Sequence, residues 1–400
     1  MSLHRLIQQV SVMAVSKLQA RAVRNISIME SSKRNADQGK EHQTLLHGAV
    51  LKNRALEKEV NKYDEFLKAH ICDITELSNY PPEIEPSLKR FREVLHNNVP
   101  FSSHRFGLPL YNAYCSIVAP VVPTEDERRK MLILGCCIEI QTSSFAVDDD
   151  IMDHEETRKG RPCWYKRPEV GLMAINDASF MQSIVFETLR KEFRKEPYYM
   201  DLVERVLLTE RKYLIGQNVD MTPSKKDITA LSRGTMVTIY TYNTVPWLFF
   251  PIAFALTLAG VKDEIWWQRA EDIATKLGIF WHFSDDYQNC FNSENQYDDG
   301  TRGSDIMENK CTWPIIEALE RATPGQLEIL RENYGQQDVV KMNKVLDVYN
   351  EMNIPEVYKE AKRACYNEVM EAIHKCEGNP PKGLFTYLLD LVFLEYSAGD

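Results

Sequence analysis

The sequence predicts an all-α protein, built as a single large helical domain behind a short leader. Apolar residues recur at intervals of three and four along most of its 400 residues, which is the period of an amphipathic helix. Segments with the alternating pattern of β-strands are scarce. No Pro/Gly/Ser-rich linker, fixed-period repeat or low-complexity tract divides the chain. We therefore expect one domain over residues 46–400.

Residues 1–45 have the composition of a leader. The first 29 residues contain four basic side chains, Arg5, Lys17, Arg21 and Arg24, and no acidic one. This pattern is typical of an organelle transit peptide, and it would place the protein in mitochondria. The alternative is a frayed tail without a function, in which case we expect a cytoplasmic protein.

Seven segments carry the helical pattern most clearly, and Pro, Gly, Asn or Asp residues mark the breaks between them. They are residues 56–76, 126–153, 177–193, 199–221, 265–290, 323–335 and 357–376. With the segments between them, they predict about ten helices or more. No apolar run approaches the roughly 20 residues that span a bilayer, so we expect no membrane span.

The overall charge and the cysteines exclude several classes of protein. The net charge is −10, whereas nucleic-acid binding usually shows a basic patch, so we expect no nucleic-acid partner. The nine cysteines form no CxxC motif or regular framework. This favours free thiols and argues against a secreted disulfide scaffold or a zinc module.

Two predicted helices end in acidic clusters. In "DDIMD", Asp149 and Asp153 lie four residues apart, with Asp150 beside them, and in "DDYQN" Asp285 and Asn289 repeat this spacing. Residues four apart share one face of a helix. Carboxylates at a helix carboxyl end oppose the macrodipole, so we expect cations to arrive from elsewhere. One such cluster alone is also typical of an exposed helix end, but two at the mouth of an apolar cavity would suit Mg²⁺.

Basic residues follow both clusters. Arg158, Lys159 and Arg161 lie in "TRKGRPCW", and Arg302 and Lys310 lie in "TRGSDIMENKCTW". Metal-binding carboxylates and cations together indicate a polyanionic ligand, and a diphosphate fits this requirement.

These motifs, together with "AINDA" and "GQNVDM", resemble the farnesyl diphosphate synthase branch of the isoprenyl diphosphate synthases from about residue 56 to the carboxyl terminus. The resemblance implies the isoprenoid synthase fold, with a central apolar cavity and usually a homodimer. It also implies that an allylic diphosphate binds through three Mg²⁺ ions. Asp149, Asp153, Asp285 and Asn289 would be the metal ligands, with Asp150 also counted among the catalytic residues. Arg158, Lys159, Gln217 and Lys310 would contact the allylic diphosphate or its metal shell.

Several positions depart from the pattern of that family. The loop that grips isopentenyl diphosphate has Ser103 and Phe106 where the family has Lys and Arg, with Arg105 one place away. Asn243 replaces a Lys, and Trp281-His282 replaces "FQ". The expected loss of the second-substrate site favours ionisation alone, as in the terpene synthases that evolved from this family in insects.

The main functional prediction is therefore an Mg²⁺-dependent terpene synthase that converts farnesyl diphosphate to a sesquiterpene. Two alternatives stay open: a geranyl or farnesyl diphosphate synthase with a remodelled isopentenyl site, and a non-catalytic partner subunit. Ser144 and Phe145 occupy the family's chain-length positions, and Ser144, Phe145, Trp281 and Asn243 are the predicted cavity residues. A small residue at 144 would deepen the cavity, although helical Ser also often bonds a backbone carbonyl one turn back.

Overall fold

The computed structural model describes residues 63–72, 81–100, 107–158, 160–222, 227–292 and 302–394. These residues belong to one compact unit. The predicted leader, residues 1–45, lies outside the described residues, so its role and the localisation of the protein stay predictions.

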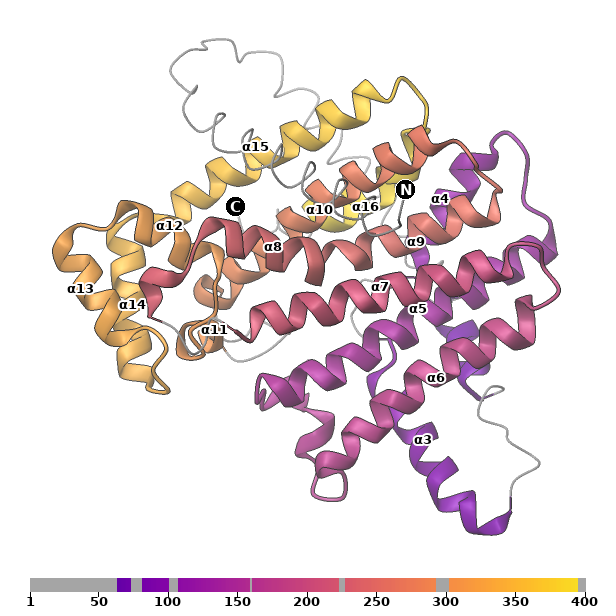
Figure 1. The fold of residues 1–400 in the computed structure, drawn as a ribbon, viewed down its shortest axis with the longest axis horizontal. Coiled ribbons are helices and arrows are strands. Elements are labelled where there is room, and N and C mark those ends of the chain that lie inside the picture. Colours follow the sequence, from indigo (N-terminus) through magenta and orange to yellow (C-terminus); the bar gives the residue numbers. More distant parts are fainter. Residues whose placement is uncertain are drawn as a thin grey trace, which may run out of the picture. The chain divides into compact units, whose positions relative to one another are not determined.

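The all-α prediction is confirmed (Figure 1). Residues 63–72 are helical. Up to residue 193, the elements that follow are η1 (Pro82–Ile84), α3 (Glu85–Asn98), α4 (Leu108–Val118), α5 (Glu125–Met152), β1 (Thr157–Arg158), β2 (Arg161–Pro162), η2 (Trp164–Lys166), η3 (Gly171–Met173) and α6 (Ala174–Phe193). The remainder are α7 (Tyr199–Asp220), η5 (Ile228–Ala230), α8 (Arg233–Asn243), α9 (Val245–Leu258), α10 (Glu264–Phe291), α11 (Ser304–Met307), α12 (Trp313–Arg321), α13 (Pro324–Asn333), α14 (Val339–Glu351), α15 (Ile354–Lys375) and α16 (Gly383–Leu394).

The two helices with acidic ends, α5 and α10, are each 28 residues long. A capping box begins α5: Thr124 Oγ1 accepts from the Glu127 backbone N–H at 3.3 Å, and the Glu127 carboxylate accepts from the Thr124 N–H at 2.7 Å. Asp263 caps α10 by accepting from the Ile265 N–H at 2.9 Å. These caps satisfy backbone donors that have no acceptor within their helices.

Helix α9 was not among the segments with the clearest pattern, and its burial explains why. Almost every residue of "VPWLFFPIAFALTL" is buried, so no polar face reveals the helical period. It packs against α4, α7 and α10. Gly278 of α10 permits this approach, because a Cβ there would lie 2.9 Å from Val245 Cα.

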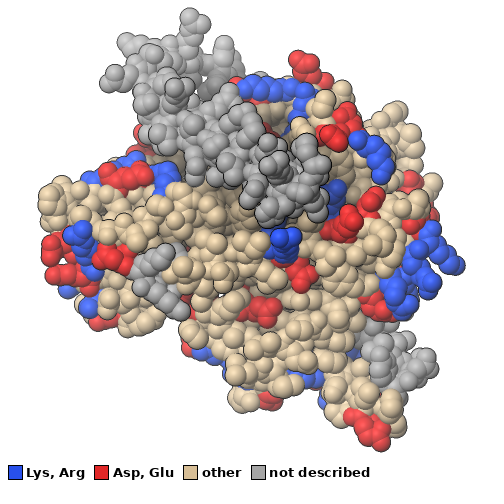
Figure 2. All heavy atoms as spheres, viewed as in Figure 1, with Lys and Arg blue, Asp and Glu red and all other residues tan. Residues whose placement is uncertain are grey.

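Helices α5, α6 and α7 run side by side, and α8 packs against α7 (Figure 1). Among the described helices, α5 is the one long and apolar enough to cross a membrane, but 83% of that apolar stretch is buried inside the protein. Acidic and basic side chains are interspersed on the face drawn in Figure 2. The packing of these helices brings the carboxyl ends of α5, α7 and α10 to one pocket.

Candidate active site

The two acidic clusters line the same pocket, as their spacing predicts. Asp149 and Asp153 come from the end of α5, and Asp285 and Asn289 come from the end of α10. Further carboxylates complete the acidic lining: Glu155, Asp220, Asp286 and Asp305.

Lys310 supplies the cation that these helix ends require. Its Nζ pairs with Asp153 and lies 3.1 Å from Asp220 Oδ2, so it joins α5 to α7. Only 14% of its side chain is exposed. Burial works against its charge, but Asp220 and Asp153 raise the pKa of Lys310 well above its usual value. The side chain therefore stays protonated at any physiological pH.

One lysine does not neutralise this many acids. Burial, and then Asp153, raises the pKa of Asp149 to about 8. Burial also raises the pKa of Asp305 to about 8, with Asp285 adding to the shift. Among the described residues, Asp153 Oδ1 is a buried oxygen with no hydrogen-bond donor. A crowded set of hard oxygen ligands with an open acceptor fits a divalent cation of the Mg²⁺ type.

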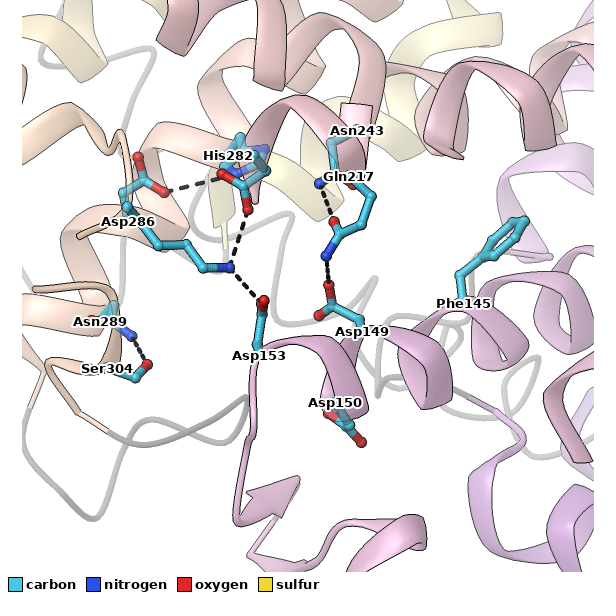
Figure 3. Close-up of polar contacts among 12 residues, drawn as sticks. Phe145, Asp149, Asp150, Asp153, Gln217, Asn243, His282, Asp286, Asn289 and Ser304 are labelled. Carbon is cyan, nitrogen blue, oxygen red and sulfur yellow. Dashed lines mark hydrogen bonds and ion pairs between the residues drawn. The ribbon is translucent and has the colours of Figure 1, made fainter. Parts of the chain in front are cut away.

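A chain of amides holds Asp149 in place (Figure 3). Gln217 Nε2 donates to Asp149 Oδ1 at 2.7 Å, and Asn243 Nδ2 donates to Gln217 Oε1 at 3.0 Å. Gly216 makes this possible, because a Cβ there would lie 2.6 Å from the Asn243 backbone nitrogen. The close approach of α7 to α8 thus sets the orientation of the first aspartate. Gln217, expected to contact the diphosphate or its metal shell, thus hydrogen-bonds a predicted metal ligand.

Asp150 has a different role from the catalytic one expected of it. It points away from Gln217 and Asn243 (Figure 3), and it is absent from the pocket lining. Its Oδ1 accepts from Arg158 Nε at 2.9 Å and from Arg158 Nη2 at 2.6 Å. This fork orients the Arg158 guanidinium, which does line the pocket. Asp150 is therefore a positioning residue.

The residues of the second cluster all line the pocket, but Asp286 is also bonded to neighbouring helices. Asp285 and Asn289 line the pocket, and Asn289 Nδ2 donates to Ser304 Oγ at 3.1 Å. Asp286 is 4% exposed and accepts from the Tyr240 hydroxyl and, at 2.7 Å, from the Trp313 N–H. Burial, and then Asp305, raises the pKa of Asp286 well above its usual value. Asp286 therefore ties α10 to α8 and α12.

His282 extends this second cluster into the cavity. Its Nδ1 lies 2.5 Å from Thr244 Oγ1, and its ring stacks on Tyr240 with centroids 4.2 Å apart. Burial, and then Lys310, lowers the pKa of His282 to about 3. The imidazole is therefore neutral at physiological pH.

Three aromatic rings form the apolar wall of the pocket. The Phe145 centroid lies 4.3 Å from that of Tyr213 and 5.0 Å from that of Trp247, and those two are 5.3 Å apart. Trp281 and Asn243 also line the pocket, as expected. Ser144 does not line it: the side chain is fully buried and its hydroxyl donates to Gln141 O at 2.7 Å. The backbone bond explains this departure from the expected deepening of the cavity.

The sequence reasoning missed several lining residues. Asp220 lies within the quoted motif "GQNVDM", where only Gln217 was singled out, and Asp305 lies within "TRGSDIMENKCTW", where Arg302 and Lys310 were singled out. Tyr213 lies four residues before Gln217 on α7, a spacing that could have revealed it. Lys159, Ser103 and Phe106 lie outside the described residues.

A family model and individual relatives give the same result when the chain is compared with known proteins. A family model described as polyprenyl synthetase matches residues 91–352. The chain is 34% identical to a farnesyl pyrophosphate synthase of Bos taurus, over 78% of this chain and 89% of the relative. A farnesyl pyrophosphate synthase of Saccharomyces cerevisiae is 35% identical over 71% and 82%. One of Nezara viridula is 34% identical over 80% and 78%.

Proposed function

Because the chain belongs to the polyprenyl synthetase family, we propose that it is a prenyltransferase that joins an allylic diphosphate to isopentenyl diphosphate, with farnesyl diphosphate as the product. The observation that carries this proposal is the pocket itself: paired carboxylate clusters, two partly buried cations and an aromatic wall meet in one place.

The terpene synthase interpretation is corrected by the relatives. Proteins that match most of this chain are named farnesyl pyrophosphate synthase. The argument for ionisation alone rested chiefly on Ser103 and Phe106, which lie outside the described residues, and also on departures such as Asn243 and Trp281-His282. These few substitutions did not outweigh a match over most of the chain.

The residues divide the chemistry between two ends of the pocket. At the polar end, Arg158 and Lys310 would receive the leaving diphosphate as the allylic C–O bond breaks, since both are charged and line the pocket. At the other end, Phe145, Tyr213 and Trp247 would exclude water and present π faces to the carbocation. The isopentenyl double bond then attacks the allylic carbon, and loss of a proton completes the transfer.

We assign the metal to the acidic mouth of the pocket. Asp149, Asp153, Asp285 and Asn289 would hold Mg²⁺, which when bound would supply positive charge to stabilise the leaving diphosphate. Gln217 and Asn243 would keep Asp149 oriented for this task. The binding of three ions stays a prediction.

The homodimer also stays a prediction. Helix α7 exposes apolar side chains that a second copy of the chain could cover: Leu207, Leu214 and Ile215 are 51%, 50% and 42% exposed.

The full chain, incubated with dimethylallyl diphosphate, isopentenyl diphosphate and Mg²⁺, should form prenyl diphosphates that mass spectrometry detects. Asp149→Asn should reduce kcat by more than about 100-fold, because losing a metal ligand costs at least as much as losing its supporting residue. A control, Asp338→Asn, removes a carboxylate that caps α14 and should leave kcat within twofold. The proposal would be contradicted if the wild-type protein made no prenyl diphosphate with a longer chain than dimethylallyl diphosphate.

A further inference from the structure

A two-stranded hairpin follows the acidic end of α5. Strands β1 and β2 pair in antiparallel register, with Thr157 opposite Pro162 and Arg158 opposite Arg161. Gly160 in the turn has a φ of +66°, a conformation that glycine adopts without strain. The hairpin thus places two arginines opposite one another.

Contacts at its base fix the hairpin to the core. The Cys163 N–H donates to Glu156 O at 3.1 Å, which continues the pairing beyond the strands. The next residue, Trp164, is 2% exposed, and its Nε1 donates to Asp177 Oδ2 at 2.8 Å. Asp177 is itself fully buried and held by Arg90. The backbone position of Arg161 is therefore defined by buried contacts only two and three residues away.

The register places Arg161 on the same face as Arg158. Residues directly opposite in an antiparallel pair project from one face of the ribbon. Arg158 indicates which face this is, because Arg158 is among the residues that line the pocket. Arg161 is therefore expected to project from the same face as Arg158, as an exposed side chain beyond the residues that line the pocket itself.

The charges around the two arginines differ. Arg158 is neutralised by Asp150, with which it forms a fork of two hydrogen bonds. Arg161 is exposed and has no hydrogen bond or ion pair to the described residues, whereas Arg90 and Arg167 on nearby segments both bond side chains. Like charges directly opposite destabilise a strand pair. An anion at the rim would offset that cost.

We infer that Arg161 binds the diphosphate of isopentenyl diphosphate at the rim of the pocket. This inference rests on the proposed function, which requires two diphosphates to bind side by side. Arg158 and Lys310 are engaged with the carboxylates of the metal site and serve the allylic diphosphate. The guanidinium of Arg161, which bonds none of the described residues, can meet a second diphosphate with two parallel hydrogen bonds.

Steady-state kinetics of the full chain test this inference. Arg161→Gln should raise KM for isopentenyl diphosphate about tenfold, the effect of losing about 1.4 kcal/mol of binding, and leave KM for the allylic substrate and kcat within twofold. Arg161→Lys should recover part of the loss. The matched control is Arg194→Gln, an exposed arginine that follows α6, and it should change neither KM. An unchanged KM for isopentenyl diphosphate, or a rise confined to the allylic substrate, would overturn the inference.

Titration calorimetry with isopentenyl diphosphate separates this inference from the proposed function, because it needs no turnover. A tenfold weaker affinity in Arg161→Gln than in the wild type supports the role of Arg161. Equal affinities, or no binding to the wild type, overturn it. Failure of the wild type to make any prenyl diphosphate refutes the proposed function separately, and the calorimetric comparison still decides the role of Arg161.

Discussion

Lys310 controls the charge balance of the pocket at the scale of single residues. It lies between carboxylates of α5 and α7, and several other acids share the same space. Without its charge, the buried Asp153 and the partly buried Asp220 would lose the one cation to which both are paired in the described part of the chain. Lys310 therefore both stabilises the fold and neutralises carboxylates of the pocket.

Lys310→Met should therefore lower both stability and activity. Breaking a buried ion pair from one side costs about 3–5 kcal/mol of unfolding free energy. Mg²⁺ should raise the Tm of this variant more than that of the wild type, because the cation replaces the missing charge among the carboxylates. Calorimetry with EDTA and with Mg²⁺ measures this difference. The control Lys359→Met, on the exposed face of α15, should show the wild-type response, and an equal Mg²⁺ response in Lys310→Met would contradict the account.

The acidic spacing in the sequence predicted that Asp149, Asp153, Asp285 and Asn289 meet, and they do line one pocket. The sequence could not separate Asp150 from its neighbours, because the fork to Arg158 depends on how the chain turns after α5. Nor could it show that Ser144 bonds its own helix. Such distinctions depend on side-chain direction, which spacing alone does not set.

At the scale of elements, helices α5, α7 and α9 each contribute one ring to the aromatic wall. Trp247 of α9 is 8% exposed and packs against both Phe145 and Tyr213. Because Ser144 faces the helix rather than the pocket, we expect the size of Trp247 to limit how far the proposed prenyl substrate can extend.

Trp247→Ala should lengthen the product by at least one five-carbon unit. Removing the indole opens space behind Phe145, at a stability cost of about 3–5 kcal/mol. The product distribution is measured by chromatography of the dephosphorylated alcohols. Trp267→Ala removes a tryptophan of α10 that stacks with Arg205 and lies outside the pocket lining, so its products should keep the wild-type length. Unchanged products from Trp247→Ala would mean that another element limits the cavity.

The amino-terminal cap of α5 should make stability depend on acid pH. Hydrogen bonds from Thr124, and then from Tyr114, lower the pKa of Glu127 from 4.5 to about 2. A carboxyl group whose pKa is lower in the folded state stabilises the fold above pH 4.5, and this contribution is lost as the pH falls towards 2.

Denaturant titrations between pH 6 and pH 3 check this expectation. Glu127→Gln should lose less unfolding free energy over that range than the wild type does. Glu328→Gln, on the exposed surface of α13, should retain the wild-type slope. Identical slopes in all three proteins would show that the cap does not contribute to acid sensitivity.

Across the whole molecule, helical periodicity predicted the α-rich architecture because most helices are amphipathic, with one polar face. It failed for α9, which is buried on all sides, and it gave no sign that Gly216 would join α7 to α8. The functional prediction failed because it, too, relied on a local pattern. It gave the greatest weight to one loop, Phe101 to Phe106, whereas the match to polyprenyl synthetases extends over residues 91–352.

Labelled substrates test the central claim, that this pocket joins two prenyl units. The full chain should be given farnesyl diphosphate alone in one mixture, and dimethylallyl diphosphate with carbon-labelled isopentenyl diphosphate in another, both with Mg²⁺. The account predicts that farnesyl diphosphate alone yields no volatile product, and that label from isopentenyl diphosphate appears in a longer prenyl diphosphate. A sesquiterpene from farnesyl diphosphate alone, with no label transferred in the second mixture, would contradict it.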